Sequence, residues 1–126
     1  MARKEKLLQS RDDLQTAITL YGKISSRKNT EKRMAFLSLS KALEIAVEYA
    51  WKWIKRSMEE EGLDPQSPKA AVRDAARVGL IADPQQWMLY INTRNAGVHD
   101  YFSVPEKEYV EIARRLEAEL DRLLQQ

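Results

Sequence analysis

The stretch that decides the fold is FLSLSKALEIAVEYAWKWIK, residues 36–55. Its apolar residues recur at steps of three, four and seven, which is the spacing of one face of an α-helix. That face consists of Leu39, Leu43, Ala46, Val47, Ala50 and Ile54. Other apolar side chains spread around the remaining circumference, namely Phe36, Leu37, Ile45, Tyr49, Trp51 and Trp53. A helix with so much apolar surface lies at the centre of a bundle or faces a partner subunit.

Signals of helix ends and starts flank this stretch on both sides. We expect the long helix to run from about Thr30 to Glu61, because Gly62 stands where a C-terminal cap is required. An earlier helix, from about Arg3 to Lys23, carries one apolar stripe made of Leu7, Leu14, Ala17, Ile18 and Tyr21. The polar segment KISSRKNT, residues 23–30, connects the two helices.

Three further helices are predicted downstream. The pairs Ser67-Pro68 and Asp83-Pro84 each place a capping side chain before a proline, which is typical of a helix start. The first of these helices ends near Gly79. The residues Ser103-Val104-Pro105-Glu106 resemble a capping box. They precede a last helix with apolar residues at steps of three and four, namely Tyr109, Ile112, Leu116, Leu120 and Leu123.

These patterns together predict the fold class. No segment shows the period-two alternation of a β-strand, and no internal repeat or flexible linker divides the chain. We therefore expect an all-α protein, an up-and-down bundle of four to five helices forming a single domain over residues 1–126.

Composition narrows the class of protein further. Hydrophobic residues make up 44% of the chain and charged residues 32%, and the start carries no apolar signal-peptide core. Apolar runs are far shorter than the ~18 residues that cross a bilayer, and cysteine is absent. We expect a cytoplasmic protein without a membrane partner. The net charge of +2 is too small for a protein that coats duplex DNA, so any nucleic-acid contact should be local.

The single histidine of the chain, His99, lies in the most polar part of the fourth predicted helix, RNAGVHDY, residues 94–101. Each helical residue advances by about 100°, so Arg94 and Tyr101 fall on one stripe, and Asn95 and His99 on an adjoining one. This band is either a functional site or a polar helix terminus. In the second case the imidazole interacts favourably with the helix dipole at the C-terminus, and the tyrosine packs against the core.

Other kinds of site lack their ligands in this sequence. It contains no glycine-rich phosphate loop, no nucleophilic serine motif and no His-x-x-x-His pair. One histidine without any cysteine is too few for the usual zinc sites, and the contiguous carboxylates at residues 59–61 lack the spacing of a calcium loop. We therefore expect neither a metal site nor a cofactor.

RNAGVHDY resembles the Arg-x-x-x-x-His-x-Tyr signature of HEPN-fold proteins. Two more stretches resemble the HepT-like partners of minimal nucleotidyltransferases, a group also called nucleotidyltransferase substrate-binding proteins. They are EIAVEYAWKWIK, residues 44–55, and SPKAAVRDAARVGLIADPQQW, residues 67–87. The resemblance covers residues 44–101. It departs at Thr93, where the family often has an acidic residue, so no carboxylate directly precedes Arg94 to orient or neutralise it.

The resemblance implies a two-fold homodimer in which the motifs of both subunits face a shared cleft. It also implies a cognate nucleotidyltransferase as partner. Several members are metal-independent ribonuclease toxins, and in some pairs the antitoxin adenylylates the motif tyrosine, here Tyr101. Other members are non-catalytic subunits that bind a nucleotide or substrate for the nucleotidyltransferase.

The residue types suit RNA cleavage. His99 can act as general acid or base, and Arg94 can hold phosphate oxygens, so these two are the candidate catalytic residues. Asn95 and Tyr101 can support them through hydrogen bonds. One histidine per chain falls short of an acid–base pair, so this hypothesis requires a dimer. A non-catalytic nucleotide-binding subunit is the alternative, and a purely structural bundle is a third.

Overall fold

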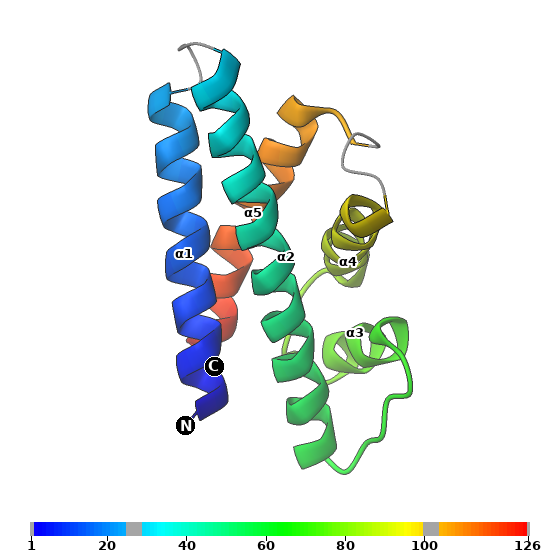
Figure 1. The fold of residues 1–126 in the computed structure, drawn as a ribbon. Helices are drawn as coiled ribbons and strands as arrows, with labels where there is room; N and C mark the ends of the chain where they lie inside the picture. Colours follow the sequence, from blue (N-terminus) through cyan, green and yellow to red (C-terminus); the bar gives the residue numbers. More distant parts are fainter. Residues whose placement is uncertain (1, 25–28, 100–103, 126) are drawn as a thin grey trace.

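The computed structural model of the chain describes residues 2–24, 29–99 and 104–125. Its five helices are α1 (Ala2–Ile24), α2 (Asn29–Glu60), α3 (Pro68–Arg77), α4 (Pro84–His99) and α5 (Glu106–Leu124) (Figure 1). Within the described part of the chain there is no β-strand. The predicted all-α bundle is therefore confirmed, with five helices.

Helix α2 is the central element of the bundle. It contacts all four other helices: α1 lies antiparallel beside it, α5 lies behind both, and α3 and α4 cover its other side (Figure 1). The predicted face from Leu39 to Ile54 is buried, as is Phe36. The central position explains much of the broad apolar circumference of α2, although Tyr49, Trp51 and Trp53 are only half-buried and Leu37 is exposed.

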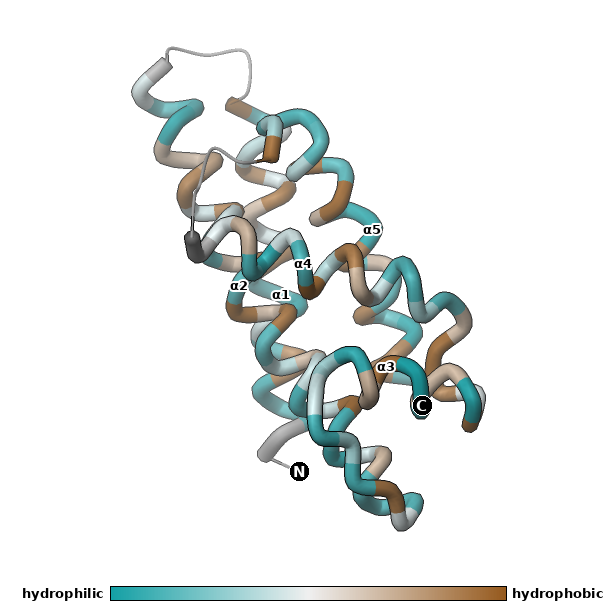
Figure 2. Tube along the Cα trace, turned by 90° about the vertical axis from the view of Figure 1, so that its right-hand side faces the viewer, coloured by the Kyte–Doolittle hydropathy of each residue, from teal (hydrophilic) through white to brown (hydrophobic). Residues whose placement is uncertain are grey.

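No described helix combines the length and the apolar character that crossing a membrane requires. Figure 2 shows why, since hydrophilic and hydrophobic residues alternate along every helix. Each helix buries one stripe and exposes the other. The predicted stripes of α1 and α5 are among the buried residues, including Leu7, Leu14, Leu116 and Leu120, all with no exposed surface.

The helix ends that were predicted from local signals are confirmed. Gly62 takes a positive φ of 85°, and the Leu63 N–H donates to the Met58 carbonyl at 3.0 Å, which closes α2. The Ser67 hydroxyl accepts a hydrogen bond from the Ala70 N–H at 3.1 Å and so caps α3. The Asp83 carboxylate accepts one from the Gln86 N–H at 3.1 Å and caps α4.

The predicted capping box of the last helix involves Ser103, which lies outside the described residues. Helix α5 begins at Glu106, with Pro105 at its N-cap position. The Glu106 carboxylate accepts a 2.5 Å hydrogen bond from the Tyr21 hydroxyl of α1 and lies 3.6 Å from the Lys32 ammonium of α2. This contact joins the start of α5 to α1 and α2. Burial, together with this hydrogen bond, raises the pKa of Tyr21 to about 12.

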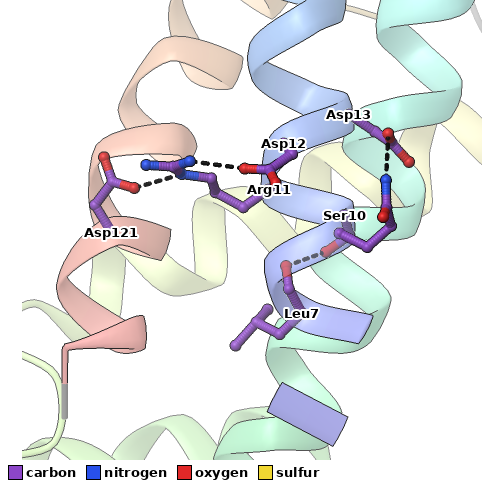
Figure 3. Close-up of polar contacts among 7 residues, drawn as sticks. Leu7, Ser10, Arg11, Asp12, Asp13 and Asp121 are labelled. Atoms are coloured by element: carbon purple, nitrogen blue, oxygen red, sulfur yellow. Dashed lines mark hydrogen bonds and ion pairs between the residues drawn. The ribbon is translucent and has the colours of Figure 1, made fainter. Parts of the chain in front are cut away.

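A second polar contact fixes α1 against α5 (Figure 3). The Arg11 guanidinium donates to the Asp121 carboxylate at 2.6 Å and to the neighbouring Asp12 carboxylate at 2.7 Å. The adjacent Ser10 is buried, and its hydroxyl donates to the Leu7 carbonyl of its own helix at 2.8 Å. The long helices α1, α2 and α5 therefore pack together as a three-helix unit, against which α3 and α4 pack.

Candidate functional site

The candidate site lies on the second half of α4, where this helix packs against the middle of α2. Trp87 and Tyr90 anchor α4 because both are buried, with ring centroids 5.2 Å apart in an edge-to-face arrangement. Ile91 is buried as well, one turn before Arg94. The Arg94 side chain emerges from this anchored segment with 30% of its surface exposed. Its backbone position is therefore set by core packing. Its side chain is partly accessible, although the guanidinium Nε is buried.

Arg94 is held by two side chains. Its Nη1 donates to the Asn95 amide oxygen at 3.1 Å, and its Nη2 lies 3.4 Å from the Glu48 carboxylate of α2. The other oxygen of that carboxylate lies 3.2 Å from the Lys52 ammonium, one turn further along α2. The structure thus brings together two of the predicted residues, Arg94 and Asn95. It adds Glu48, which the site prediction missed.

Glu48 supplies the carboxylate that position 93 lacks. Thr93 is buried, with 4% of its surface exposed, and its hydroxyl donates to the Leu89 carbonyl of its own helix at 2.7 Å. The side chain at this position therefore faces the bundle interior and is occupied by its own helix. The orientation of Arg94 comes from the neighbouring helix instead. The signal in the sequence was the pair of carboxylates Glu44 and Glu48, four residues apart on one face of the long helix.

The last turn of α4 is seated against α5. A Cβ atom added at Gly97 would stand 3.9 Å from the Tyr109 hydroxyl, which is an ordinary van der Waals contact. Tyr109 is itself buried, and its hydroxyl donates to the Ser40 carbonyl of α2 at 3.4 Å. Three helices therefore meet beneath the end of α4, two residues before His99.

Two of the predicted site residues cannot be placed relative to Arg94. His99 is the last helical residue of α4, but its side chain lies outside the described residues, as does all of Tyr101. Their proximity to Arg94 and Asn95 remains a prediction. Among the described residues, no three histidine or carboxylate side chains are grouped to hold a metal ion.

Comparison with known families identifies the chain. Residues 5–126 match the model of a family described as nucleotidyltransferase substrate binding protein like. The chain belongs to this family. Among curated proteins, no sequence matches the chain significantly.

Two solved structures share the fold of this nucleotidyltransferase substrate-binding protein. The protein HI0074 from Haemophilus influenzae, described as revealing the fold of a substrate-binding domain of a nucleotidyltransferase, superposes with a TM-score of 0.84 at 18% identity. The match covers 97% of this chain and 96% of the other. A chain from a toxin–antitoxin crystal structure with AMP-PNP superposes with a TM-score of 0.73 at 13% identity, covering 94% and 95% of the two chains. At these identities, the similarity establishes a shared fold.

The residue types in the described part of the site suit the binding of an anion. A guanidinium is charged at every physiological pH, and its planar fork matches two phosphate oxygens. Arg94 presents that fork at the surface, with Asn95 beside it as a hydrogen-bonding amide. An incoming phosphate must share the guanidinium with Glu48 or displace that carboxylate. The Arg94–Glu48 pair therefore sets the resting state of the site.

Proposed function

We propose that the chain is the partner subunit of a separate nucleotidyltransferase and acts in the cytoplasm as a metal-independent endoribonuclease of a toxin–antitoxin-like pair. Membership of the nucleotidyltransferase substrate-binding family supports the partnership, and similarity to a chain of a toxin–antitoxin structure supports the pairing. The observation that carries the proposal is the partly exposed Arg94 guanidinium, oriented by Glu48 and Asn95 five residues before the histidine that ends α4.

The proposed reaction is transfer of the phosphodiester to the neighbouring 2′-hydroxyl. A base removes the 2′-hydroxyl proton, the 2′-oxygen bonds to phosphorus, and the bond to the 5′-oxygen breaks as an acid protonates that oxygen. The products are a 2′,3′-cyclic phosphate and a 5′-hydroxyl. An imidazole suits either proton transfer at neutral pH, and a guanidinium stabilises the charge on the phosphoryl oxygens. We assign these roles to His99 and Arg94, with Asn95 and Tyr101 in support.

The reaction needs an acid and a base, whereas each chain has one histidine. We therefore propose that a two-fold homodimer forms the active enzyme, because symmetry places two copies of His99 and Arg94 in one composite site.

The test is RNA cleavage in the presence of EDTA by the purified chain and by the variants His99→Ala and Arg94→Ala. Arg73→Ala, an exposed arginine on α3, is the matched control. We expect 2′,3′-cyclic ends from the parent chain and the control, and none from His99→Ala at unchanged helix content and dimer mass. Cleavage that persists in His99→Ala would remove the histidine from the mechanism.

A non-catalytic role is the second candidate, and membership of the nucleotidyltransferase substrate-binding family favours it. In that role Arg94 and His99 bind a nucleotide phosphate for the nucleotidyltransferase without turnover. Binding would then weaken in His99→Ala, while the parent chain would leave RNA intact at every concentration tested.

We further propose Tyr101 as the point of control by the partner. In this step the tyrosine oxygen bonds to the α-phosphorus of ATP, the bond to the β-phosphate oxygen breaks, and pyrophosphate and a proton leave. The attached AMP would place an anion and an adenine near Arg94 and exclude RNA by charge and bulk. Incubation with the nucleotidyltransferase and ATP should add the mass of AMP to the peptide containing Tyr101. Modification confined to another peptide would contradict this assignment.

A further inference from the structure

A second surface of the protein combines aromatic and cationic side chains. A cleft of about 500 Å³ lies between the start of α1 and the second half of α2. We call it the α1–α2 cleft. Its lining includes Lys6 of α1 and five residues of α2, namely Tyr49, Lys52, Trp53, Lys55 and Arg56. None of these residues belongs to the predicted site around Arg94.

The charge of the cleft is positive, with four cations and one lining carboxylate, Glu59. Lys6 and Lys55 form no ion pair with any residue in the described part of the chain. The pairs formed by Lys52 and Arg56 are exposed contacts within one helix, which water and salt weaken. An anionic ligand would therefore meet four cations with little competition from the protein's own carboxylates.

The aromatic side chains stand among these cations. Tyr49 and Trp53 are half-buried against the core and line the cleft, and the Lys52 ammonium lies 5.8 Å from the centre of the Tyr49 ring. The Trp53 indole nitrogen is buried without a hydrogen-bond acceptor among the described residues. Half-buried rings next to cations are the elements that bind single-stranded nucleic acid, because bases stack on the rings while phosphates meet the charges.

We propose that the α1–α2 cleft binds a segment of single-stranded RNA, with phosphates on Lys52 and Arg56 and a base stacked on Tyr49. Its role in cleavage rests on the ribonuclease function proposed above. Glu48 connects the two surfaces, because one of its oxygens lies 3.2 Å from Lys52 and the other 3.4 Å from Arg94. A strand bound in the cleft would therefore lead toward the candidate site, and the cleft would select unpaired RNA.

A second cleft of similar size differs in chemistry and provides a control. It lies between α3 and α4, with a volume of about 510 Å³. Val72, Met88 and Leu89 form an apolar floor, and Lys69 and Arg73 stand at its edge without an aromatic ring among the lining residues. Two cations one helical turn apart are thus present in both clefts. Only the α1–α2 cleft also offers rings on which a base can stack.

The experiment measures binding of a fluorescent single-stranded RNA decamer by anisotropy as a function of salt, in the His99→Ala background so that the RNA stays intact. The test variant is Lys52→Gln/Arg56→Gln, and the control is Lys69→Gln/Arg73→Gln. Each lost phosphate contact on a single strand lowers the slope of log K against log salt by about 0.7. We expect the test variant to lose roughly 1.4 from the slope and to bind at least about tenfold more weakly, while the control binds as before.

Tyr49→Leu separates stacking from charge. It should weaken binding by on the order of tenfold without changing the salt slope. Tyr49→Phe should bind RNA as tightly as the parent chain, because the ring is kept. Equal binding of duplex and single-stranded RNA, or unchanged binding in Tyr49→Leu, would overturn the stacking role.

The outcomes distinguish this proposal from the proposed function. RNA that binds in the cleft but is never cut by the parent chain would refute the ribonuclease and leave the cleft standing. Cleavage and binding that are both unchanged in Lys52→Gln/Arg56→Gln would refute the cleft and leave the ribonuclease standing. If that variant instead changes the oligomeric mass in light scattering and leaves RNA binding unchanged, the cleft is an interface between copies, and the RNA proposal is overturned.

Discussion

Replacing Glu48 with glutamine removes the one carboxylate that Arg94 and Lys52 share, while the size of the side chain is kept. Both partners of the interhelical pair are about one-third exposed, with 30% for Arg94 and 36% for Glu48. Partly exposed pairs of this kind contribute roughly 0.2–1 kcal/mol, and a pair at i,i+4 on one helix about 0.3–0.5 kcal/mol. We therefore expect Glu48→Gln to lower the free energy of unfolding by about 1 kcal/mol, or a few degrees in Tm.

A double-mutant cycle separates the two pairs. Glu48→Gln and Arg94→Gln, made singly and together, should give a coupling energy of roughly 0.5–1 kcal/mol in urea unfolding. The cycle with Lys52→Gln should give the smaller helical value of about 0.3–0.5 kcal/mol. Both coupling energies should decrease at about 0.5 M salt, because the screening length is then only a few ångströms.

Glu59→Gln is the matched control, because Glu59 is exposed on the same helix and makes no ion pair with the described residues. It should change the stability by less than about 0.5 kcal/mol. A coupling energy between Glu48 and Arg94 that is indistinguishable from zero at low salt would refute the conclusion that Glu48 orients the arginine.

Three further predictions concern helix α4 and the contact between α1 and α5. Gly97→Ala should raise the free energy of unfolding by about 0.5–1 kcal/mol, because alanine favours the helix and the added methyl group meets nothing closer than the Tyr109 hydroxyl at 3.9 Å. A loss of stability in urea would show that this contact is tighter than described. Asp83→Ala should lower the free energy of unfolding by about 1 kcal/mol because it removes the cap of α4, and Asp83→Asn should retain most of that stability. Equal losses of stability for the two variants in calorimetry would argue against the cap. Stability should fall as the pH rises from about 10 to about 12, because the unfolded Tyr21 ionises near 10 and the folded one near 12. Tyr21→Phe should show a shallower decline in urea titrations over that range, and an identical decline would exclude Tyr21 as its source.

Local signals predicted most of the fold. The caps of α3 and α4 act within three residues of the helix start, so Ser67 and Asp83 could be recognised without knowledge of the rest of the chain. The hydrogen bond between Tyr21 and the Glu106 carboxylate could not be recognised in this way, because the two residues are 85 positions apart in the chain. A capping pattern describes only what neighbouring residues can do, and it gives no information about such tertiary contacts.

In the candidate site, too, contacts between neighbouring residues could be predicted, and contacts between helices could not. Arg94 and Asn95 are adjacent in sequence, so their contact follows from the motif itself. Glu48 reaches Arg94 from another helix. The spacing of Glu44 and Glu48 places two carboxylates on one face of the long helix, but it does not indicate which of them contacts Arg94. The aromatic residues of α2 show a third case. Their spacing indicated an unusually broad apolar surface, but only the packing of four neighbouring helices shows that Tyr49 and Trp53 remain partly open at a cleft.

The most direct test of the proposed function is cleavage of single-stranded RNA in EDTA by the purified chain and by His99→Ala, with matched circular dichroism spectra and matched oligomeric mass. We expect the parent chain to produce 2′,3′-cyclic ends and His99→Ala to produce none. Equal cleavage by both proteins, or intact RNA with both at every concentration, would contradict the assignment of a histidine-dependent ribonuclease.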